Sequence, residues 1–327
     1  MDTFECPFSF FSRKMPNAIA FEDIELTLSY LEAELIISGI CKTLRKELSV
    51  DTPCVTLITE KSINCVLIFF ALLRYQVSVF LVCGKTPQKS LKEYMQNIGT
   101  NIIISSSKKF HNTGAKKALT FRDLLYQKDK MPRWFFSPNF VATYTLTSGS
   151  SSTPKIACHS FKNHFKSAIG SQKHIQIQPG DRYLFSMHLH HIAGLALLFR
   201  TLTQGATVSF NHTCIKITHI SFLPIQLLRF MREKKKLQLK CILLGGAPIS
   251  KEIYTQALGE GLNVLPSYGM TEMSSTITSN ISENQFSMGH PLPYRKLKIS
   301  SDGEILVKGD TLFKGYLNNT QSLSFDL

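Results

Sequence analysis

Apolar segments of strand length alternate with segments of helical length along most of this 327-residue chain. In the first third, Ser29 and Glu32 match a capping box, in which each side chain bonds the backbone of the other residue at a helix start. The pattern predicts helices and strands in the order helix 29–48, strand 54–59, helix 62–75, strand 77–83, helix 87–99 and strand 101–106. Strands that alternate with helices favour a mainly parallel sheet with helices on its faces. We therefore expect an α/β protein.

A second alternation of the same kind runs from residue 140 to residue 246. The polar, proline-bearing segment 127–139 lies before it and predicts a boundary between sub-domains. From about residue 289, short strands separated by SDG and GD turns predict a small antiparallel unit. We therefore expect two α/β sub-domains followed by a β unit, at about 1–135, 136–285 and 286–327.

Residues 65–83 form the one candidate for a membrane-spanning segment. Arg74 and Gln76 lie at its centre, where a charge is costly in lipid. A buried helix that leads into a buried strand explains the segment better, so we expect no transmembrane segment. The first 17 residues begin acidic and have no basic start or long apolar stretch, so a signal peptide is not expected either.

The chain has 37 Lys and Arg against 23 Asp and Glu, a formal net charge of +14. This charge indicates an anionic partner, such as a nucleotide, a coenzyme, an acidic substrate, a nucleic acid or a membrane surface. The basic residues are scattered, and the densest run, 232–236, is typical of a solvated helix end, so no nucleic acid is expected. Eight well-separated cysteines without a C-x-x-C pair predict reduced thiols in a cytoplasmic protein.

A serine-rich segment, TSGSSSTPK at 147–155, is the first candidate for a binding site. It follows an apolar strand and precedes a helical pattern, a setting in which hydroxyls and backbone N–H groups converge on phosphate. Lys155 would add a positive charge. The segment is no Walker A loop, because the second glycine before the lysine is missing. Alone, its composition is that of a flexible linker, and that alternative stays open.

Two downstream motifs add to this candidate site. In SYGMTEMSST, 267–276, Thr271 can bond a phosphate, Glu272 can hold Mg²⁺ through oxygen, and Tyr268 can offer its ring to a base. In LLGGAPIS, 243–250, paired glycines after an apolar strand allow close approach by a flat ligand. The structural alternative for the first motif is a strand end followed by a glycine turn.

These three motifs, in this order and at these separations, resemble the adenylate-forming superfamily of acyl- and aryl-CoA ligases, luciferases and peptide-synthetase adenylation domains. The resemblance covers nearly the whole chain and implies ATP and Mg²⁺ as cofactors and CoA as co-substrate. It implies that Lys155, Thr271 and Glu272 are catalytic, with Glu272 on the metal and Thr271 on the α-phosphate. The residues that it assigns to ATP are Thr147, Ser148, Gly149, Ser150, Ser151, Ser152, Lys155, Gly245, Gly246, Ala247, Ser267, Tyr268, Gly269, Met270 and Thr271.

Within that superfamily, five segments look most like the o-succinylbenzoate-CoA ligases of menaquinone biosynthesis: 186–208, 221–228, 243–250, 267–278 and 289–299. This resemblance implies that His191 lies beside the acid and that Arg200 lies near an aromatic acid and its second carboxylate. An arginine on an apolar helix needs an anionic partner if it is buried, but a surface arginine whose head reaches water fits the sequence equally well. The H-x-H-H run at 188–191 is the pattern of core or surface histidines, and no acidic or cysteine ligand at close spacing supports a metal.

The chain departs from the family at two places. Ser152 stands where members of the family usually carry a glycine. After the segment like 303–319, members continue into a Thr-Gly-Asp motif, a hinge and a C-terminal domain with an adenylation lysine, all of which we expect to be absent before Leu327. The sequence is thus interpreted as the N-terminal domain of an acid-CoA ligase that forms acyl-AMP. The alternatives are a catalytically silent nucleotide- or acid-binding relic, or one half of an enzyme whose C-terminal domain is a separate polypeptide.

Overall fold

The computed structural model describes residues 4–49, 51–110, 113–125, 128–130, 132–147, 154–233, 237–281 and 286–317. Seven of the described strands form one sheet, in the order β20 (Gly315–Tyr316), β10 (Lys155–Ser160), β9 (Val141–Thr147), β5 (Ser78–Cys83), β4 (Cys54–Thr59), β6 (Ile102–Ser105) and β7 (Lys117–Thr120). The strands from β9 to β7 pair in parallel, whereas β10 pairs antiparallel with both β9 and β20.

Nine of the described strands form the second sheet, in the order β17 (His290–Pro291), β16 (Ser275–Ser279), β15 (Val264–Met270), β14 (Cys241–Leu244), β13 (His219–Phe222), β11 (Arg182–Leu184), β12 (Thr207–Ser209), β2 (Ile19–Glu22) and β3 (Thr27–Ser29). Its central strands, from β2 to β15, are parallel, and its edges are antiparallel. Two small antiparallel pairs complete the strands, β1 (Phe4–Glu5) with β8 (Phe135–Phe136) and β18 (Arg295–Ile299) with β19 (Ile305–Gly309).

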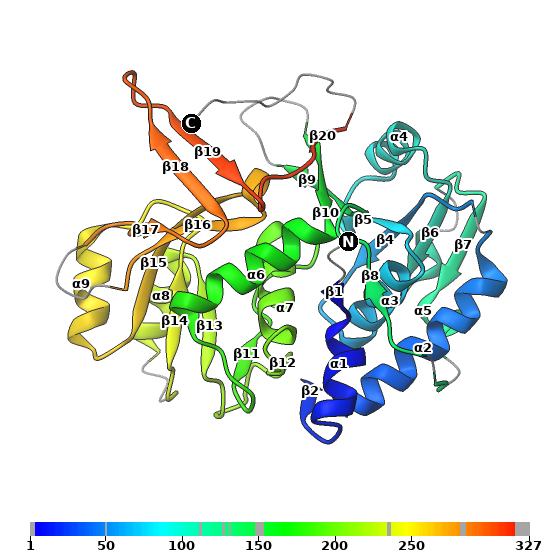
Figure 1. Ribbon diagram of the computed structural model, residues 1–327, viewed down its shortest axis with the longest axis horizontal. Coiled ribbons are helices and arrows are strands. Elements are labelled where there is room, and N and C mark those ends of the chain that lie inside the picture. Colours follow the sequence, from blue (N-terminus) through cyan, green and yellow to red (C-terminus); the bar gives the residue numbers. More distant parts are fainter. Residues whose placement is uncertain are drawn as a thin grey trace.

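Helices cover both sheets, and α6 and α7 lie between them (Figure 1). The described helices are α1 (Pro7–Lys14), α2 (Tyr30–Glu47), α3 (Ile63–Arg74), α4 (Gln88–Ile98), α5 (Phe121–Leu124), α6 (Phe161–Ile175), α7 (Ile192–Leu202), α8 (Pro224–Arg232) and α9 (Lys251–Gly259). Buried side chains from both sheets belong to one apolar cluster, which includes Leu57, Val79, Phe199 and Val208. The core therefore runs through the helix layer between the sheets and fixes the two sheets against each other.

The predicted α/β class and the small antiparallel unit are confirmed. The capping box at the start of α2 is also present, with Ser29 N donating to Glu32 Oε2 at 2.9 Å and Glu32 N to Ser29 Oγ at 3.2 Å. The sub-domain boundary near residue 135 stays a prediction, but the sheets exchange strands across it. The N-terminal strands β2 and β3 lie in the second sheet, while β9, β10 and β20 lie in the first.

Strand β10 differs from what the sequence predicts. The serine-rich segment was expected to lead directly into a helix, but it joins the antiparallel strands β9 and β10, and α6 begins only after its N-cap, Ser160. The six residues of β10 are short and run straight into the helical pattern, so periodicity does not separate them. Thr147 and Lys155, the two described ends of the segment next to these strands, pair with each other, and the argument from a helix N-terminus does not apply at this position.

The apolar stretch 65–83 divides into the buried helix α3 and the buried strand β5, as predicted. Its central charge, Arg74, is fully buried and pairs with the Glu34 carboxylate of α2. Within the described part of the chain, no helix has the length and apolar character needed to cross a membrane.

Candidate active site

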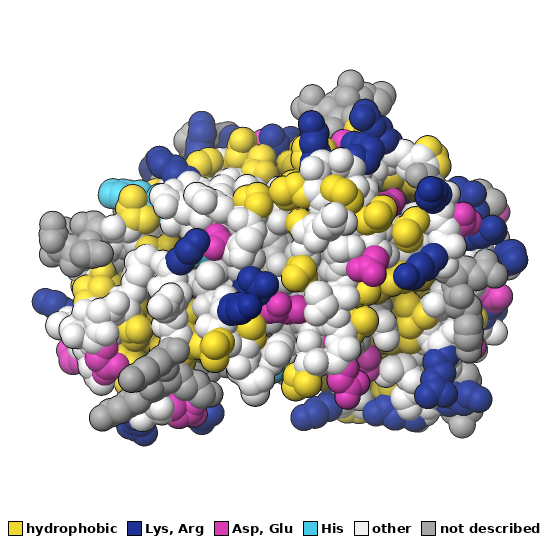
Figure 2. Space-filling model, turned by 90° about the horizontal axis from the view of Figure 1, so that it is seen from below, with side chains coloured by type: hydrophobic (Ala, Val, Ile, Leu, Met, Phe, Trp, Pro, Cys, Tyr) yellow, Lys and Arg dark blue, Asp and Glu magenta, His cyan; other side chains and the backbone are white. Residues whose placement is uncertain are grey.

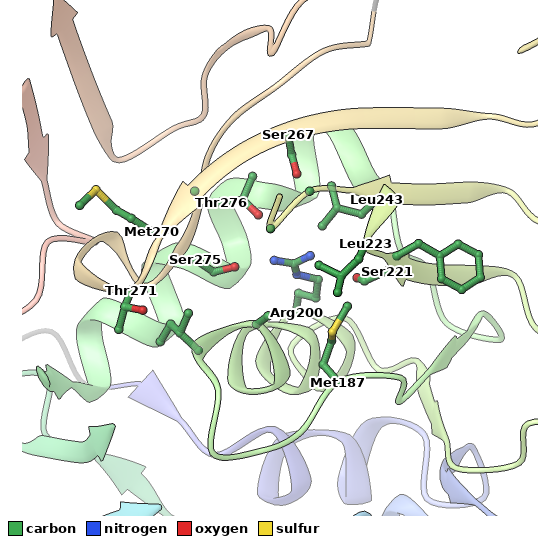
Figure 3. Close-up of a pocket in the computed structure, with 16 residues that line it drawn as sticks. Met187, Arg200, Ser221, Leu223, Leu243, Ser267, Met270, Thr271, Ser275 and Thr276 are labelled. Carbon is green, nitrogen blue, oxygen red and sulfur yellow. The ribbon is translucent and has the colours of Figure 1, made fainter. Parts of the chain in front are cut away.

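A cavity of about 350 Å³ lies at the carboxyl ends of β13, β14 and β15. Residues from these strands and the turns after them form one wall, and Met187 with residues of α7 forms the other (Figure 3). In open α/β sheets, ligands bind in the crevice outside the carboxyl ends of parallel strands, because the connecting turns leave room there. This cavity is thus the first place to look for a bound substrate.

Two glycines after β14 keep the backbone close to β15. A Cβ atom on Gly245 would lie 2.5 Å from Ser267 Oγ, and Gly246 has a φ of +76°, in the left-handed region that favours glycine. Any side chain at Gly245 would push β14 and β15 apart, so the paired glycines allow the close packing that shapes this wall. Gly245, Gly246 and Ser267 all line the cavity.

Arg200 comes from the last part of α7 and is only 3% exposed. Its guanidinium lies in the middle of the cavity and points toward the side of Ser267, Ser275 and Thr276 (Figure 3). Arg200 Nε is buried without a hydrogen bond, and no carboxylate of the described residues forms an ion pair with this side chain. The alternative of a surface arginine is therefore wrong. A buried cation without a counter-ion favours an anionic ligand, whose charge would offset the cost of desolvation.

Three further residues around Arg200 were not singled out by the sequence. Tyr183 and Ser221 share a hydrogen bond of 2.8 Å between their hydroxyl oxygens, and Ser221 lines the cavity. Arg295 is also buried, and its Nη2 donates to Ser167 Oγ at 2.9 Å. Burial, and then the charge of Arg200, lower the pKa of Arg295 to about 9. A second buried cation near Arg200 makes this side of the site strongly electropositive.

Thr271 lines the cavity at the end of β15, in a short 3₁₀ turn, Thr271–Met273. His159 of β10 supports this turn, because its Nε2 lies 2.7 Å from the carbonyl oxygen of Thr271. Burial lowers the pKa of His159 to about 4, so the imidazole is neutral near pH 7 and must donate through Nε2–H. The turn that carries Thr271 and Glu272 is thereby tied to the strand that begins at Lys155.

Glu272 faces a second cavity, of about 200 Å³, with Met270 on the wall that both cavities share. The hydroxyl of Tyr316 donates a short hydrogen bond to Glu272 Oε1. Lys155 Nζ lies 5.0 Å from the centre of the Tyr316 ring. Lys155, predicted to meet the phosphates, and Glu272, predicted to hold Mg²⁺, therefore both lie against one tyrosine.

Residues 8–317 match the family described as AMP-binding enzyme. The chain belongs to this family. The chain is 31% identical over 265 residues to the 2-succinylbenzoate–CoA ligase of Escherichia coli (strain K12), an alignment that covers 79% of this chain and 57% of that protein. It thus spans little more than half the length of this curated relative.

Solved structures of AMP-binding enzymes share the fold. An Escherichia coli MenE with bound OSB-AMS superposes with a TM-score of 0.87 at 25% identity, covering 98% of this chain and 72% of that one. The o-succinylbenzoate coenzyme A synthetase of Bacillus subtilis in complex with ATP and magnesium superposes with a TM-score of 0.88 at 23% identity, covering 97% and 73%. The likeness therefore extends over nearly the whole of this chain.

The structure brings many of the predicted site residues together, but not all. The first cavity is lined by Arg200, Gly245, Gly246, Ser267, Gly269, Met270 and Thr271. Ala247 is exposed, and Tyr268 is half-buried on β15 without lining either cavity. Thr147 ends β9 and donates from its hydroxyl to the carbonyl oxygen of Lys155 at 3.4 Å. Ser148, Gly149, Ser150, Ser151 and Ser152 lie outside the described residues.

His191 caps the start of α7 and is exposed, while the next two residues line the first cavity. Its ring lies 4.4 Å from that of His190, whose Nδ1 is 2.7 Å from the Thr59 hydroxyl at the end of β4. Burial, and then the neighbouring histidines, lower the pKa of His190 to about 4. Among the described residues, no group of three or more His, Cys, Asp or Glu is placed to hold a metal ion by itself.

Proposed function

We propose that this chain binds ATP and a carboxylic acid and carries out the adenylation step of an acid-CoA ligase. In that step an oxygen of the acid attacks the α-phosphorus of ATP, the bond to pyrophosphate breaks, and acyl-AMP forms. The sulfur of CoA then attacks the acyl carbon, its proton is lost and AMP leaves, so that the products are acyl-CoA, AMP and pyrophosphate. Catalysis of the first step requires groups that bring two anions together and stabilise the charge on phosphate.

The observation that carries this proposal is the buried, uncompensated guanidinium of Arg200 in a cavity at the carboxyl ends of parallel strands. Its planar fork suits a carboxylate better than any other common anion except phosphate. Met187, Ile192 and Leu243 supply apolar walls beside it, which suit the ring of an aromatic acid. An o-succinylbenzoate-like acid, with one carboxylate at Arg200 and another toward Thr271, fits these features.

The nucleotide would lie between the two cavities, at Gly245, Gly246 and Thr271, with Lys155 near the departing pyrophosphate. Glu272 fits Mg²⁺, because its second carboxylate oxygen, Oε2, takes no hydrogen bond or ion pair from the described residues. Mg²⁺ is usually held by one or two carboxylates together with water and substrate phosphates, so one glutamate suffices. When bound, the metal would neutralise charge on the phosphates. Lys155 and Thr271 would orient them.

We further propose that CoA is the acyl acceptor and that residues outside these 327 complete the site, on the same polypeptide or on a second one. Reading the coding DNA past Leu327 in all frames for a Thr-Gly-Asp motif and a lysine-bearing domain separates these two arrangements. A cytoplasmic location stays a prediction, which the eight unpaired cysteines support. On the face shown in Figure 2, Lys and Arg are interspersed with Asp and Glu, which favours small anions over a nucleic acid.

Calorimetry with o-succinylbenzoate, ATP and a non-hydrolysable acyl-AMP mimic tests the binding part of the proposal. We expect the mimic to bind more tightly than the acid or ATP alone, since it fills both the cavity at Arg200 and the nucleotide site. Trapping of acyl-AMP by hydroxylamine then separates binding from turnover. Binding without hydroxamate would favour the silent relic, and absence of binding by all three ligands would contradict the proposal.

A further inference from the structure

We infer that Tyr316 is a positioning residue for the metal-bound nucleotide: its hydroxyl fixes one carboxylate oxygen of Glu272 and leaves the other free for Mg²⁺. This inference rests on the proposed function and deepens it. Neither Tyr316 nor β20 belonged to the predicted site, because Tyr316 and Glu272 are 44 positions apart in the sequence. Only the fold brings them together.

The backbone around Tyr316 is fixed from two sides. Strand β20 pairs antiparallel with β10, with Tyr316 opposite Ala157, and Leu317 N donates to the carbonyl oxygen of Ile156 at 2.8 Å. Just before β20, Phe313 N donates to the carbonyl oxygen of Glu272 itself at 2.8 Å. Tyr316 is therefore held both to the strand that begins at Lys155 and to the turn that carries Glu272.

The side chain of Tyr316 has little freedom in this position. Its ring packs edge-on against Phe313, with 4.9 Å between the ring centres, and Lys155 Nζ lies over it at 5.0 Å from the centroid. Both partners come from segments that are themselves held in place by backbone hydrogen bonds. A ring locked in this way can direct its hydroxyl at a single target, which here is Glu272 Oε1.

The hydroxyl is a donor in this pair. An ionised carboxylate only accepts hydrogen bonds, so the phenol O–H donates to Glu272 Oε1. A phenol has one O–H and can donate to only one carboxylate oxygen, so Oε2 is left without a hydrogen bond from the described residues; Glu272 itself lines the second cavity. Groups that hydrogen-bond a metal-ligating carboxylate orient it and typically change metal affinity 10–100-fold when they are removed.

Titration of Mg²⁺ against the affinity for ATP tests this inference on the chain itself. The affinity for ATP is measured by calorimetry first in EDTA and then at increasing MgCl₂, for the wild-type chain, Tyr316→Phe, Glu272→Gln and the double variant. We expect Tyr316→Phe to keep its affinity in EDTA while the Mg²⁺ concentration for half-maximal tightening rises by about 10–100-fold. Since Tyr316 acts through Glu272, the double variant should be no worse than Glu272→Gln alone.

Tyr294→Phe is the matched control. Lys166 Nζ lies 4.5 Å from the centre of the Tyr294 ring, as Lys155 does near Tyr316, but the described residues give the Tyr294 hydroxyl no carboxylate partner. This control should show the Mg²⁺ dependence of the wild type. It therefore separates loss of the hydrogen bond to Glu272 from the general effect of removing a hydroxyl beside a lysine.

Other results of this titration would contradict the inference about Tyr316 or the proposed function. The inference is overturned, and the proposed function stands, if Tyr316→Phe responds to Mg²⁺ as the wild type does, or if it loses equal affinity with and without metal. It is overturned as well if Glu272→Gln keeps the full Mg²⁺ effect. If the wild-type chain binds ATP under neither condition, the proposed function fails and the inference falls with it.

Discussion

Two buried arginines, Arg74 and Arg200, occupy similar places in the two halves of the chain. Each lies near the end of an apolar helix, α3 or α7, and they are 0% and 3% exposed. Both leave Nε without a hydrogen bond. They differ in their counter-ion. Arg74 Nη1 donates to Glu34 Oε1 at 2.9 Å and Nη2 pairs with Oε2, whereas Arg200 has no carboxylate partner among the described residues.

This difference separates a charge that the protein neutralises itself from one that, in our proposal, a ligand neutralises. The Arg74–Glu34 pair joins α3 to α2, and neither side chain lines the two cavities of the candidate site. Arg200 lines a cavity, and no carboxylate of the described residues pairs with it. Burial of an arginine alone therefore says nothing about function. The deciding observation is whether the protein supplies the counter-charge itself.

The largest expected effect is on the free energy of unfolding, when the Arg74–Glu34 pair is broken. Glu34→Gln leaves the guanidinium of Arg74 buried without a counter-charge, which should lower the free energy of unfolding by about 3–5 kcal/mol. Urea unfolding measures this. Glu47→Gln, on the same helix but in a half-exposed pair with Lys117, is the control and should cost no more than about 1 kcal/mol. Equal effects of the two substitutions would mean that Arg74 gains no more from its carboxylate than an exposed lysine does. The contrast between Arg74 and Arg200 would then fail.

Removing the charge of the second arginine should affect binding and not stability. Arg200→Met should weaken binding of o-succinylbenzoate by about 2–5 kcal/mol, which is roughly 30-fold or more in Kd. The unliganded chain should unfold at the same or a higher urea concentration, because an uncompensated buried charge is lost. Arg229→Met, at an exposed position on α8, serves as the control for calorimetry. A destabilised Arg200→Met chain with unchanged affinity would reverse our assignment.

Ligand-linked stability sharpens the same comparison. A ligand at 100 times its Kd raises the free energy of unfolding by about 2.7 kcal/mol. The acid should give this gain to the wild-type chain and to Glu34→Gln alike, but not to Arg200→Met at the same concentration. Thermal shift or urea unfolding with and without acid measures it. If the gain in unfolding free energy disappears in Glu34→Gln, acid binding depends on the Arg74–Glu34 pair, and our assignment of the acid to Arg200 fails.

The smallest expected effect is on acid affinity, when the shape of the cationic group at position 200 changes but its charge does not. Arg200→Lys keeps the positive charge but loses the planar fork that can grip both oxygens of a carboxylate, so acid affinity should fall about tenfold, or ~1.4 kcal/mol. Calorimetry measures this loss against the larger loss in Arg200→Met. If the two variants lose affinity equally, the geometry of the guanidinium matters and charge alone contributes little.

Much of the fold followed from local patterns. The continuous apolar run of α3, the capping box of α2 and the glycines after β14 act within a few residues, so the sequence could show them. Strand β10 was missed because six extended residues merge into the start of α6. The sequence could not predict that β2 joins the second sheet and β20 the first, because β12 and β10, with which they pair there, lie more than 150 residues away.

In the candidate site, too, some residues could be predicted from local motifs and others only from the fold. Gly245, Gly246, Thr271 and Glu272 stand in motifs that can be read locally, and the structure places them around two adjoining cavities. The supporting residues His159, Arg295 and Tyr316 carry no local signal. Their importance comes from contacts with Thr271, with the surroundings of Arg200 and with Glu272, which are made across sheets and not along the chain.

The sequence by itself determined the kinds of elements, their order and the chemical groups available for anion binding. Tertiary structure decided which of two similar arginines pairs with a carboxylate and which lines a cavity without one among the described residues. Helix and strand patterns arise from interactions between near neighbours. The partner of a buried charge is set by how distant segments pack, as with Glu34, which lies 40 residues from Arg74.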